Sequence, residues 1–160
     1  MKLNRLFSLL AGIICLASLS SCNYNSLVEK QQTVDQNWAE VENQYQRRAD
    51  LIPNLVATVK GYAAHEENTF TKVTEARSKA TSINISAEDL NEETLAKFQE
   101  AQNQLTGALK SLLAVSEAYP DLKASANFLD LQAQLSETED KISYMRQSYN
   151  DTVMKYNNGI

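Results

Sequence analysis

The sequence predicts an all-α protein, an elongated antiparallel bundle of long helices that pack on one another as coiled coils do. Helix breakers are scarce, since beyond residue 21 the only glycines and prolines are Gly61, Gly107, Gly159, Pro53 and Pro120. Residues that favour helices, above all Ala, Gln, Glu, Leu and Lys, dominate the same region. Apolar residues also recur at steps of three and four along three long stretches, the spacing that places side chains on one side of a helix.

The segment ahead of the bundle has the order of an export signal. Lys2 and Arg5 form a basic start, and the mostly apolar run Leu6–Leu19 follows. About fourteen residues span roughly 21 Å as a helix, short of the ~30 Å hydrocarbon core of a bilayer. A cleaved signal is therefore favoured over a permanent transmembrane helix. We predict a signal peptide at residues 1–21 and a single helical bundle domain at residues 22–160.

Cys22 closes the run Leu19-Ser20-Ser21-Cys22, which resembles a bacterial lipoprotein signal. In such proteins the cysteine becomes the lipid-bearing first residue, so we expect acyl chains such as palmitate at Cys22 and an anchor in a membrane of the cell envelope. The residue after Cys22 is Asn23 and not Asp, the residue that at this position argues for retention at the inner membrane. The outer membrane is therefore preferred. The alternative is an ordinary secretory signal with an incidental cysteine.

The domain beyond the signal is acidic. Removing Lys2 and Arg5 leaves thirteen of the fifteen basic residues against twenty acidic ones, a net charge near −7. Such a domain repels nucleic acid and anionic headgroups, so we expect no nucleic-acid partner and membrane contact through the lipid alone. The remaining partners would be envelope proteins, which the sequence does not identify.

The first apolar stripe runs from Val34 to Ala76 and passes through a proline. Its members are Val34, Trp38, Val41, Tyr45, Arg48, Ile52, Leu55, Val59, Tyr62, Phe70, Val73 and Ala76. Pro53 costs roughly 3 kcal/mol inside a helix, yet the stripe keeps its phase across it. We predict one long first helix that is kinked near Pro53, giving three long helices. A break at Pro53 would instead give four segments and an up-and-down four-helix bundle.

Two further stripes predict the remaining helices. One consists of Leu95, Phe98, Gln102, Leu105, Leu109, Leu112, Ser116 and Tyr119. The other consists of Phe128, Leu131, Leu135, Thr138, Ile142, Met145, Tyr149, Val153 and Tyr156. Ser86 with Asp89 resembles a capping box and predicts a helix start near Ala87, while Tyr119-Pro120 should end the second stripe. Three acid–base pairs four residues apart should stabilise exposed faces, namely Glu75–Lys79, Glu93–Lys97 and Glu137–Lys141.

The run Tyr45–Val56 (YQRRADLIPNLV), with Val59–Tyr62 and His65-Glu66 behind it, resembles the signature of the LemA family. Further matching segments include Tyr24–Val28, Ala76-Arg77, Glu117–Lys123, Asn127–Leu129, Leu131-Gln132, Thr138-Glu139 and Tyr149-Asn150. The resemblance covers nearly all of residues 24–157. It implies an elongated, antiparallel all-α bundle held at a bacterial membrane by an N-terminal segment. It implies no activity, because the molecular function of the family is not established.

No catalytic or metal-binding constellation is visible in the sequence. His65 is the only histidine, and the domain beyond the signal carries no second histidine or free cysteine to complete a zinc site. A Ser-His-Asp arrangement would also lack a nucleophile elbow and an oxyanion loop. We therefore predict no cofactor, no metal and no catalytic residue.

The structural or interaction candidates come from the family-like run: Arg47, Arg48, Asp50, Pro53 and Asn54. Arg48 occupies a stripe position where a core residue is expected. One interpretation is a side chain whose guanidinium reaches water. The other is a partly buried ion pair with Glu117, Glu137 or Glu139 that sets the helix register.

These observations favour a lipid-anchored, non-catalytic envelope protein that acts as a scaffold or interaction module. The alternative is an accessory or modulator of an envelope protease or stress-response enzyme, which only the resemblance suggests. A hydrolase with an unrecognised site is disfavoured, because neither a nucleophile nor a base is evident.

Overall fold

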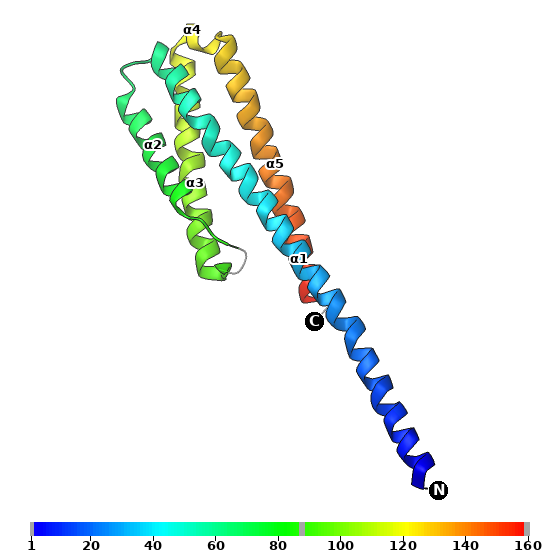
Figure 1. Cartoon of the computed structure of the whole chain (residues 1–160). Coiled ribbons are helices and arrows are strands. Elements are labelled where there is room, and N and C mark those ends of the chain that lie inside the picture. The colour runs from blue at the N-terminus through cyan, green and yellow to red at the C-terminus, as the bar shows by residue number, and fades with distance from the viewer. Residues whose placement is uncertain (1, 87–88, 159–160) are drawn as a thin grey trace. The chain divides into compact units, whose positions relative to one another are not determined.

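The computed structural model describes the backbone of residues 2–86 and 89–158 and the side chains of residues 26–86 and 89–158. Its helices are α1 (Lys2–Tyr62), α2 (Glu67–Ser82), α3 (Glu92–Val115), α4 (Pro120–Lys123) and α5 (Ala126–Asn157), with a 3-10 turn, η2, at Ser116–Ala118 (Figure 1). The described chain holds helices and connecting loops and no strand, so the all-α prediction is confirmed.

The predicted lipidation residue, Cys22, lies outside the residues whose side chains are described. Its backbone belongs to α1. No helix within the described part of the chain combines the length and the apolar character needed to cross a membrane.

The chain divides into two compact units. The first combines residues 1–38 with residues 147–160, and described side chains of α1 and α5 contact one another within it. The rings of Trp38 and Tyr149 lie 5.4 Å apart between centroids, and Asn37 Nδ2 donates a hydrogen bond of 2.7 Å to Thr152 Oγ1. The second unit is residues 39–146. The single domain expected from residue 22 onward stays a prediction.

The second unit is a bundle of four helical segments: residues 39–62 of α1, then α2, α3 and residues 126–146 of α5. Consecutive segments run in opposite directions (Figure 1). The apolar stripes form its core, as predicted. Its main cluster of buried apolar side chains consists of Ile52, Leu55, Val59, Ala63, Phe70, Val73, Ala80, Ala101, Leu105, Leu109, Leu112, Leu122, Phe128, Leu131 and Leu135.

The prediction for the first helix was wrong about where it ends. Helix α1 continues through Pro53 to Tyr62, and the chain turns at residues 63–66 before α2 begins. Tyr62, placed on the stripe by its spacing, is 46% exposed, whereas Ala63 is buried. Neither one helix as far as Ala76 nor a break at Pro53 therefore describes the structure. The four-segment topology is present, but its first connection lies beyond the proline.

The predicted start of the next helix, near Ala87, lies outside the described residues, and the helix that carries the second stripe begins later. Ser86 and Asp89 do bond, with Ser86 Oγ donating to Asp89 Oδ2 at 2.7 Å, but α3 begins at Glu92. Asn91 is its N-cap because the Asn91 side chain accepts from the Thr94 N–H at 2.9 Å. The Thr94 hydroxyl in turn accepts from the Asn91 N–H at 3.0 Å. This reciprocal pair satisfies two N–H groups that a helix start otherwise leaves open.

Of the remaining local predictions, those for Pro120 and for two acid–base pairs are confirmed, and that for the third pair is wrong. Pro120 ends the second stripe, as expected, and occupies the first turn of α4, where its missing N–H costs nothing. Glu93 pairs with Lys97 and Glu137 with Lys141. Lys79 instead donates to Gln104 on α3 at 2.8 Å, so the predicted pair with Glu75 is replaced by a bond between helices.

Candidate interaction site

The helical backbone around Pro53 is completed by a side chain from another helix. Proline has no N–H, so the carbonyl of Ala49, four residues earlier, loses its intrahelical donor. Arg77 on α2 donates from Nε to that carbonyl oxygen at 2.7 Å. Since a buried carbonyl without a partner costs free energy comparable to a lost hydrogen bond, this bond explains how α1 remains continuous through the proline.

Arg48 lies five residues before Pro53 on α1. It is the largest of the side chains that are almost fully buried. Its Nη1 donates to Glu139 Oε1 on α5 at 2.7 Å and to Thr106 Oγ1 on α3 at 3.0 Å. Its Nη2 donates to the side-chain oxygen of Gln102 on α3. One guanidinium therefore joins three helices. The guanidinium suits this role, because it carries several N–H donors on one planar group.

The structure decides between the two interpretations of Arg48. Its side chain is 2% exposed and that of Glu139 is 39% exposed, so the guanidinium does not reach water. Glu139 is the partner among the three acids considered. The other two bind lysines, since Glu117 pairs with Lys123 at 2.6 Å and Glu137 pairs with Lys141.

Tyr45 covers one side of this cluster. Arg48 Cζ lies 5.1 Å from the centroid of the Tyr45 ring, within the range of a cation–π contact. The ring also packs edge-on against Phe98, with 5.0 Å between centroids. Burial raises the pKa of the Tyr45 hydroxyl above its usual 10.0, and the nearby Arg146 and Arg48 charges oppose that change only in part.

The cluster is not perfectly satisfied. Among the described side chains, Arg48 Nε and Gln44 Oε1 are buried polar atoms without a hydrogen-bond partner. An unpaired buried group costs about 1–3 kcal/mol. The bonds of Arg48 thus link α1, α3 and α5, although its Nε is buried without a partner.

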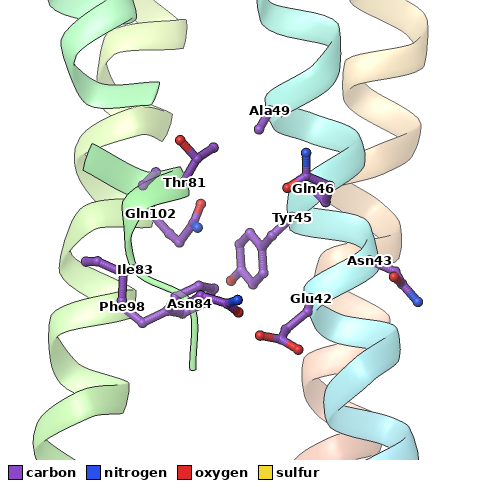
Figure 2. Close-up of a pocket in the computed structure, with 11 residues that line it drawn as sticks. Glu42, Asn43, Tyr45, Gln46, Ala49, Thr81, Ile83, Asn84, Phe98 and Gln102 are labelled. Carbon is purple, nitrogen blue, oxygen red and sulfur yellow. The ribbon is translucent and has the colours of Figure 1, made fainter. Parts of the chain in front are cut away.

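A pocket of about 240 Å³ lies beside this cluster, between α1, the end of α2, the loop after it, and α3. Its lining residues are Glu42, Asn43, Tyr45, Gln46, Ala49, Ala80, Thr81, Ile83, Asn84, Phe98 and Gln102. Figure 2 shows Tyr45 and Gln102 pointing toward each other from α1 and α3, and Asn43 pointing away from the pocket. Tyr45 and Gln102 are buried, whereas Gln46, Thr81 and Asn84 are exposed at its rim.

The other residues singled out in the sequence do not join the buried cluster. Arg47, Asp50, Pro53 and Asn54 are all exposed on α1. The spacing of Arg47, Asp50 and Asn54, three and four residues, places them on one face of the helix. Gln46 Nε2 donates to Asp50 Oδ1 at 2.8 Å within that face. The family-like run thus contains one buried arginine and a solvent-facing polar surface.

Sequence reasoning missed the structural roles of two residues. Gln102 was assigned to the second stripe without a role, although a polar residue at a stripe position is a signal of a buried partner for Arg48. Arg77 was noted only as part of the family resemblance. Its role depends on the approach of α2 to Ala49, which spacing along one helix does not reveal.

No metal site is evident in the part of the chain that the structure describes. His65 is exposed in the turn between α1 and α2, and the described residues contain no group of three His, Cys, Asp or Glu side chains arranged to hold an ion.

The fold and this cluster define a helical-bundle protein whose buried polar groups join its helices. The model of the LemA family matches residues 37–160, which is most of the chain, and the protein belongs to that family. The Arg48 cluster, the Pro53–Arg77 arrangement and the pocket all lie within the matched region.

Curated relatives are about a quarter identical to this chain over the aligned residues. Protein LemA of Metamycoplasma hominis is 26% identical over 136 residues, covering 85% of this chain and 58% of that protein. Magnetosome protein MamQ 2 of Paramagnetospirillum magneticum is 26% identical over 167 residues, covering 94% of this chain and 61% of that protein. Magnetosome protein MamQ of Magnetospirillum gryphiswaldense is 25% identical, with coverage of 84% and 56%. The chain thus spans somewhat under two thirds of the length of these relatives.

Proposed function

We propose that this protein is a lipid-anchored, non-catalytic scaffold of the bacterial cell envelope that binds other envelope proteins. The observation that carries the proposal is the use made of the polar side chains inside the bundle. Arg48 donates hydrogen bonds to Gln102, Thr106 and Glu139 across three helices, and Arg77 donates to the backbone. Groups engaged in this way hold a shape, and they are not arranged to attack a substrate.

The lipid anchor is proposed at Cys22, because a basic start, a short apolar run and the sequence Leu19-Ser20-Ser21-Cys22 together resemble a lipoprotein signal. Several acyl chains on one cysteine would hold the protein firmly, at about 0.8 kcal/mol per buried methylene. With a net charge near −7 once the signal is removed, the domain itself would be repelled by anionic headgroups. The bundle would then face the periplasm or the exterior rather than lie on the bilayer.

The exposed face of α1 is the surface proposed to contact a partner. Arg47, Asp50 and Asn54 offer a cation, a carboxylate and an amide on one side of a helix. The Arg77–Ala49 bond and the Arg48 cluster support this helix from behind. A surface held rigid in this way loses little conformational entropy on binding, which favours affinity.

The anchor is tested by expressing the full chain and its Cys22→Ser variant in a bacterium that processes lipoproteins, with labelled palmitate in the medium. We expect label and membrane fractionation for the natural chain only. The lipid anchor at Cys22 would be ruled out if neither protein carried label and the Cys22→Ser protein still fractionated with membranes.

The partner surface is tested by placing a photo-crosslinking amino acid at Asn54 in the full chain in cells, with Lys110 on α3 as a matched exposed control. Discrete adducts with envelope proteins should form from position 54 and not from position 110. Equal adducts from both positions, or none from position 54, would contradict a docking role for this face.

A further inference from the structure

We propose that α2 is a latch that controls whether α1 is continuous at Pro53, and that release of α2 opens a hinge in α1. In the closed state, Arg77 on α2 completes the helical backbone of α1. In the open state, α2 has moved away from α1 and the Ala49 carbonyl has lost its donor. The consequence for partner binding rests on the proposed function, whereas the hinge itself does not.

The hinge lies at Pro53 because the helix has its weakest point there. A proline removes one N–H and crowds the carbonyl four residues earlier, so a helix bends at this point unless another group supports it. Ala49 is 3% exposed, and its carbonyl accepts from Arg77 Nε at 2.7 Å. Loss of this bond alone would leave a buried carbonyl unpaired, which is costly. Hydration of the carbonyl requires α2 to move away, so the bond and the position of α2 change together.

A separate set of bonds holds the other three helices together. Arg48 on α1 donates to Gln102 and Thr106 on α3. It also donates to Glu139 on α5. These acceptors lie on helices other than α2, so release of α2 leaves them in place. The change therefore falls on α2 and on the residues of α1 around the proline.

Helix α2 is held less firmly than α3. It buries three side chains, whereas α3 buries six. Its start has no side-chain cap, whereas α3 begins with the reciprocal pair of Asn91 and Thr94. Beside α3 (Figure 1), the bond from Lys79 to Gln104 is exposed. Segments with few buried side chains and exposed bonds open first, so α2 is the part that moves.

The latch would control the proposed partner surface. Arg47 and Asp50 precede the proline and Asn54 follows it, and all three are exposed. They share one face only while α1 continues as a regular helix through Pro53. A partner that contacts all three residues therefore binds the closed state better, and its binding favours the docked position of α2.

Hydrogen exchange in the purified full-length chain, followed by NMR, tests the latch without any partner. The amides of Leu55 and Val56 bond to carbonyls four residues earlier, across Pro53. In the natural chain they should open together with the amide of Val73 on α2. The protection factors of these three amides should agree within about threefold and lie at least about tenfold below that of Leu105 on α3.

Variants separate the latch from a general loss of stability. Arg77→Met should lower the protection of Leu55 and Val73 together, by about tenfold. Pro53→Ala should raise the protection of Leu55 above that of Val73, because the new N–H completes the helix without help from α2. Adding Arg77→Met to Pro53→Ala should then lower the protection of Val73 alone. Lys72→Met, at an exposed position on α2, is the control and should leave both values unchanged.

The effect on the partner surface is measured in cells with the photo-crosslinking amino acid at position 54. Arg77→Met should reduce the adducts, and Pro53→Ala together with Arg77→Met should restore them. Pro53→Ala alone and Lys72→Met should keep them. If the natural chain forms no adducts, the proposed function fails, and the exchange data still decide on the latch.

The latch would be refuted if Arg77→Met lowered the protection of Val73 and left that of Leu55 unchanged. Equal protection of Leu55 and Leu105 in the natural chain would also refute it. Control of the partner surface would be refuted if Arg77→Met lowered the protection of both amides and left the adducts at position 54 unchanged.

Discussion

Arg77 Nε and the carbonyl oxygen of Ala49 lie 2.7 Å apart, and this bond replaces the one that Pro53 cannot make. The arginine comes from α2, so the continuity of α1 depends on a neighbouring helix. A helix that contains proline without such a donor would kink or end there.

Removing the donor should therefore cost stability only while the proline is present. In the natural chain, Arg77→Met should lower the free energy of unfolding by about 1–2 kcal/mol, because the Ala49 carbonyl is left unpaired. In a Pro53→Ala background the new N–H restores the helical bond, and the same change should cost clearly less. Urea unfolding of the four proteins gives the coupling directly.

Lys72→Met, an exposed position on the same helix, is the control and should change stability by less than about 0.5 kcal/mol. Equal costs of Arg77→Met in both backgrounds would show that the arginine stabilises the protein in some other way.

The Arg48–Glu139 pair should respond unequally to the loss of each partner. Glu139→Met leaves a guanidinium that is 2% exposed without its counter-charge, which typically costs about 3–5 kcal/mol. Arg48→Met leaves a carboxylate that is 39% exposed and can be hydrated, so a smaller loss of about 1–3 kcal/mol is expected. Chemical denaturation measures both values.

Glu137→Met provides the matched comparison, because Glu137 is exposed and its salt bridge is with Lys141 on the same helix. Exposed pairs of this kind contribute about 0–1 kcal/mol. If Arg48→Met proved as costly as Glu139→Met, the difference in burial would not govern the energetics of the pair. An unchanged stability in Arg48→Met would refute the structural role of the cluster.

Tyr45 should make the protein sensitive to alkali. Burial raises the pKa of its hydroxyl in the folded state above the ordinary 10.0, so the unfolded chain releases this proton first as the pH rises. The stability linked to Tyr45 is therefore complete below about pH 10 and is lost as the pH climbs through the raised folded-state pKa. In Tyr45→Phe, the free energy of unfolding should fall less steeply above pH 10.

Tyr144→Phe is the control for that measurement, since Tyr144 is 67% exposed and its replacement should leave the slope unchanged. The two variants are compared by urea unfolding at a series of pH values from 8 to 11. The same slope in Tyr45→Phe as in the natural chain would contradict the assignment.

The start of α3 should depend on Asn91 and not on Ser86. Asn91→Ala removes the side chain that accepts from the Thr94 N–H and should cost about 1 kcal/mol. Ser86→Ala removes only an exposed bond with Asp89 and should change stability by a few tenths of a kcal/mol. Thermal unfolding of both proteins checks this. A larger loss of stability in Ser86→Ala than in Asn91→Ala would support Ser86 as the helix cap instead.

Periodicity predicted the buried faces of the helices well, and their ends less well. Ile52, Leu55 and Val59 are buried as their spacing requires, because burial of one face is a property of the helix alone. Helix ends depend on competing caps, and Ser86 and Asn91 both offer suitable side chains. Asn91 is the N-cap because it forms reciprocal hydrogen bonds with Thr94. The sequence prediction looked for a cap residue followed three residues later by an acid, and that pattern selects Ser86 with Asp89.

The candidate site could likewise be predicted only in part from the sequence. Arg48 was conspicuous as a charge at a core position, and three acids were considered as its partner. Which acid lies opposite depends on the register of α5 against α1, and register is a relation between helices. Likewise the pocket requires Glu42, Asn84 and Gln102 to meet from three segments, and no local pattern brings them together.

The amino-acid sequence by itself determined that this protein is helical and which side of each helix is buried, because these follow from spacing and composition along single segments. Its resemblance to the LemA family was carried by particular runs of residues, above all Tyr45–Val56. Only the tertiary structure decided that α1 passes through Pro53, that Glu139 neutralises Arg48, and where a pocket opens. Each of these depends on side chains that a different segment of the chain supplies.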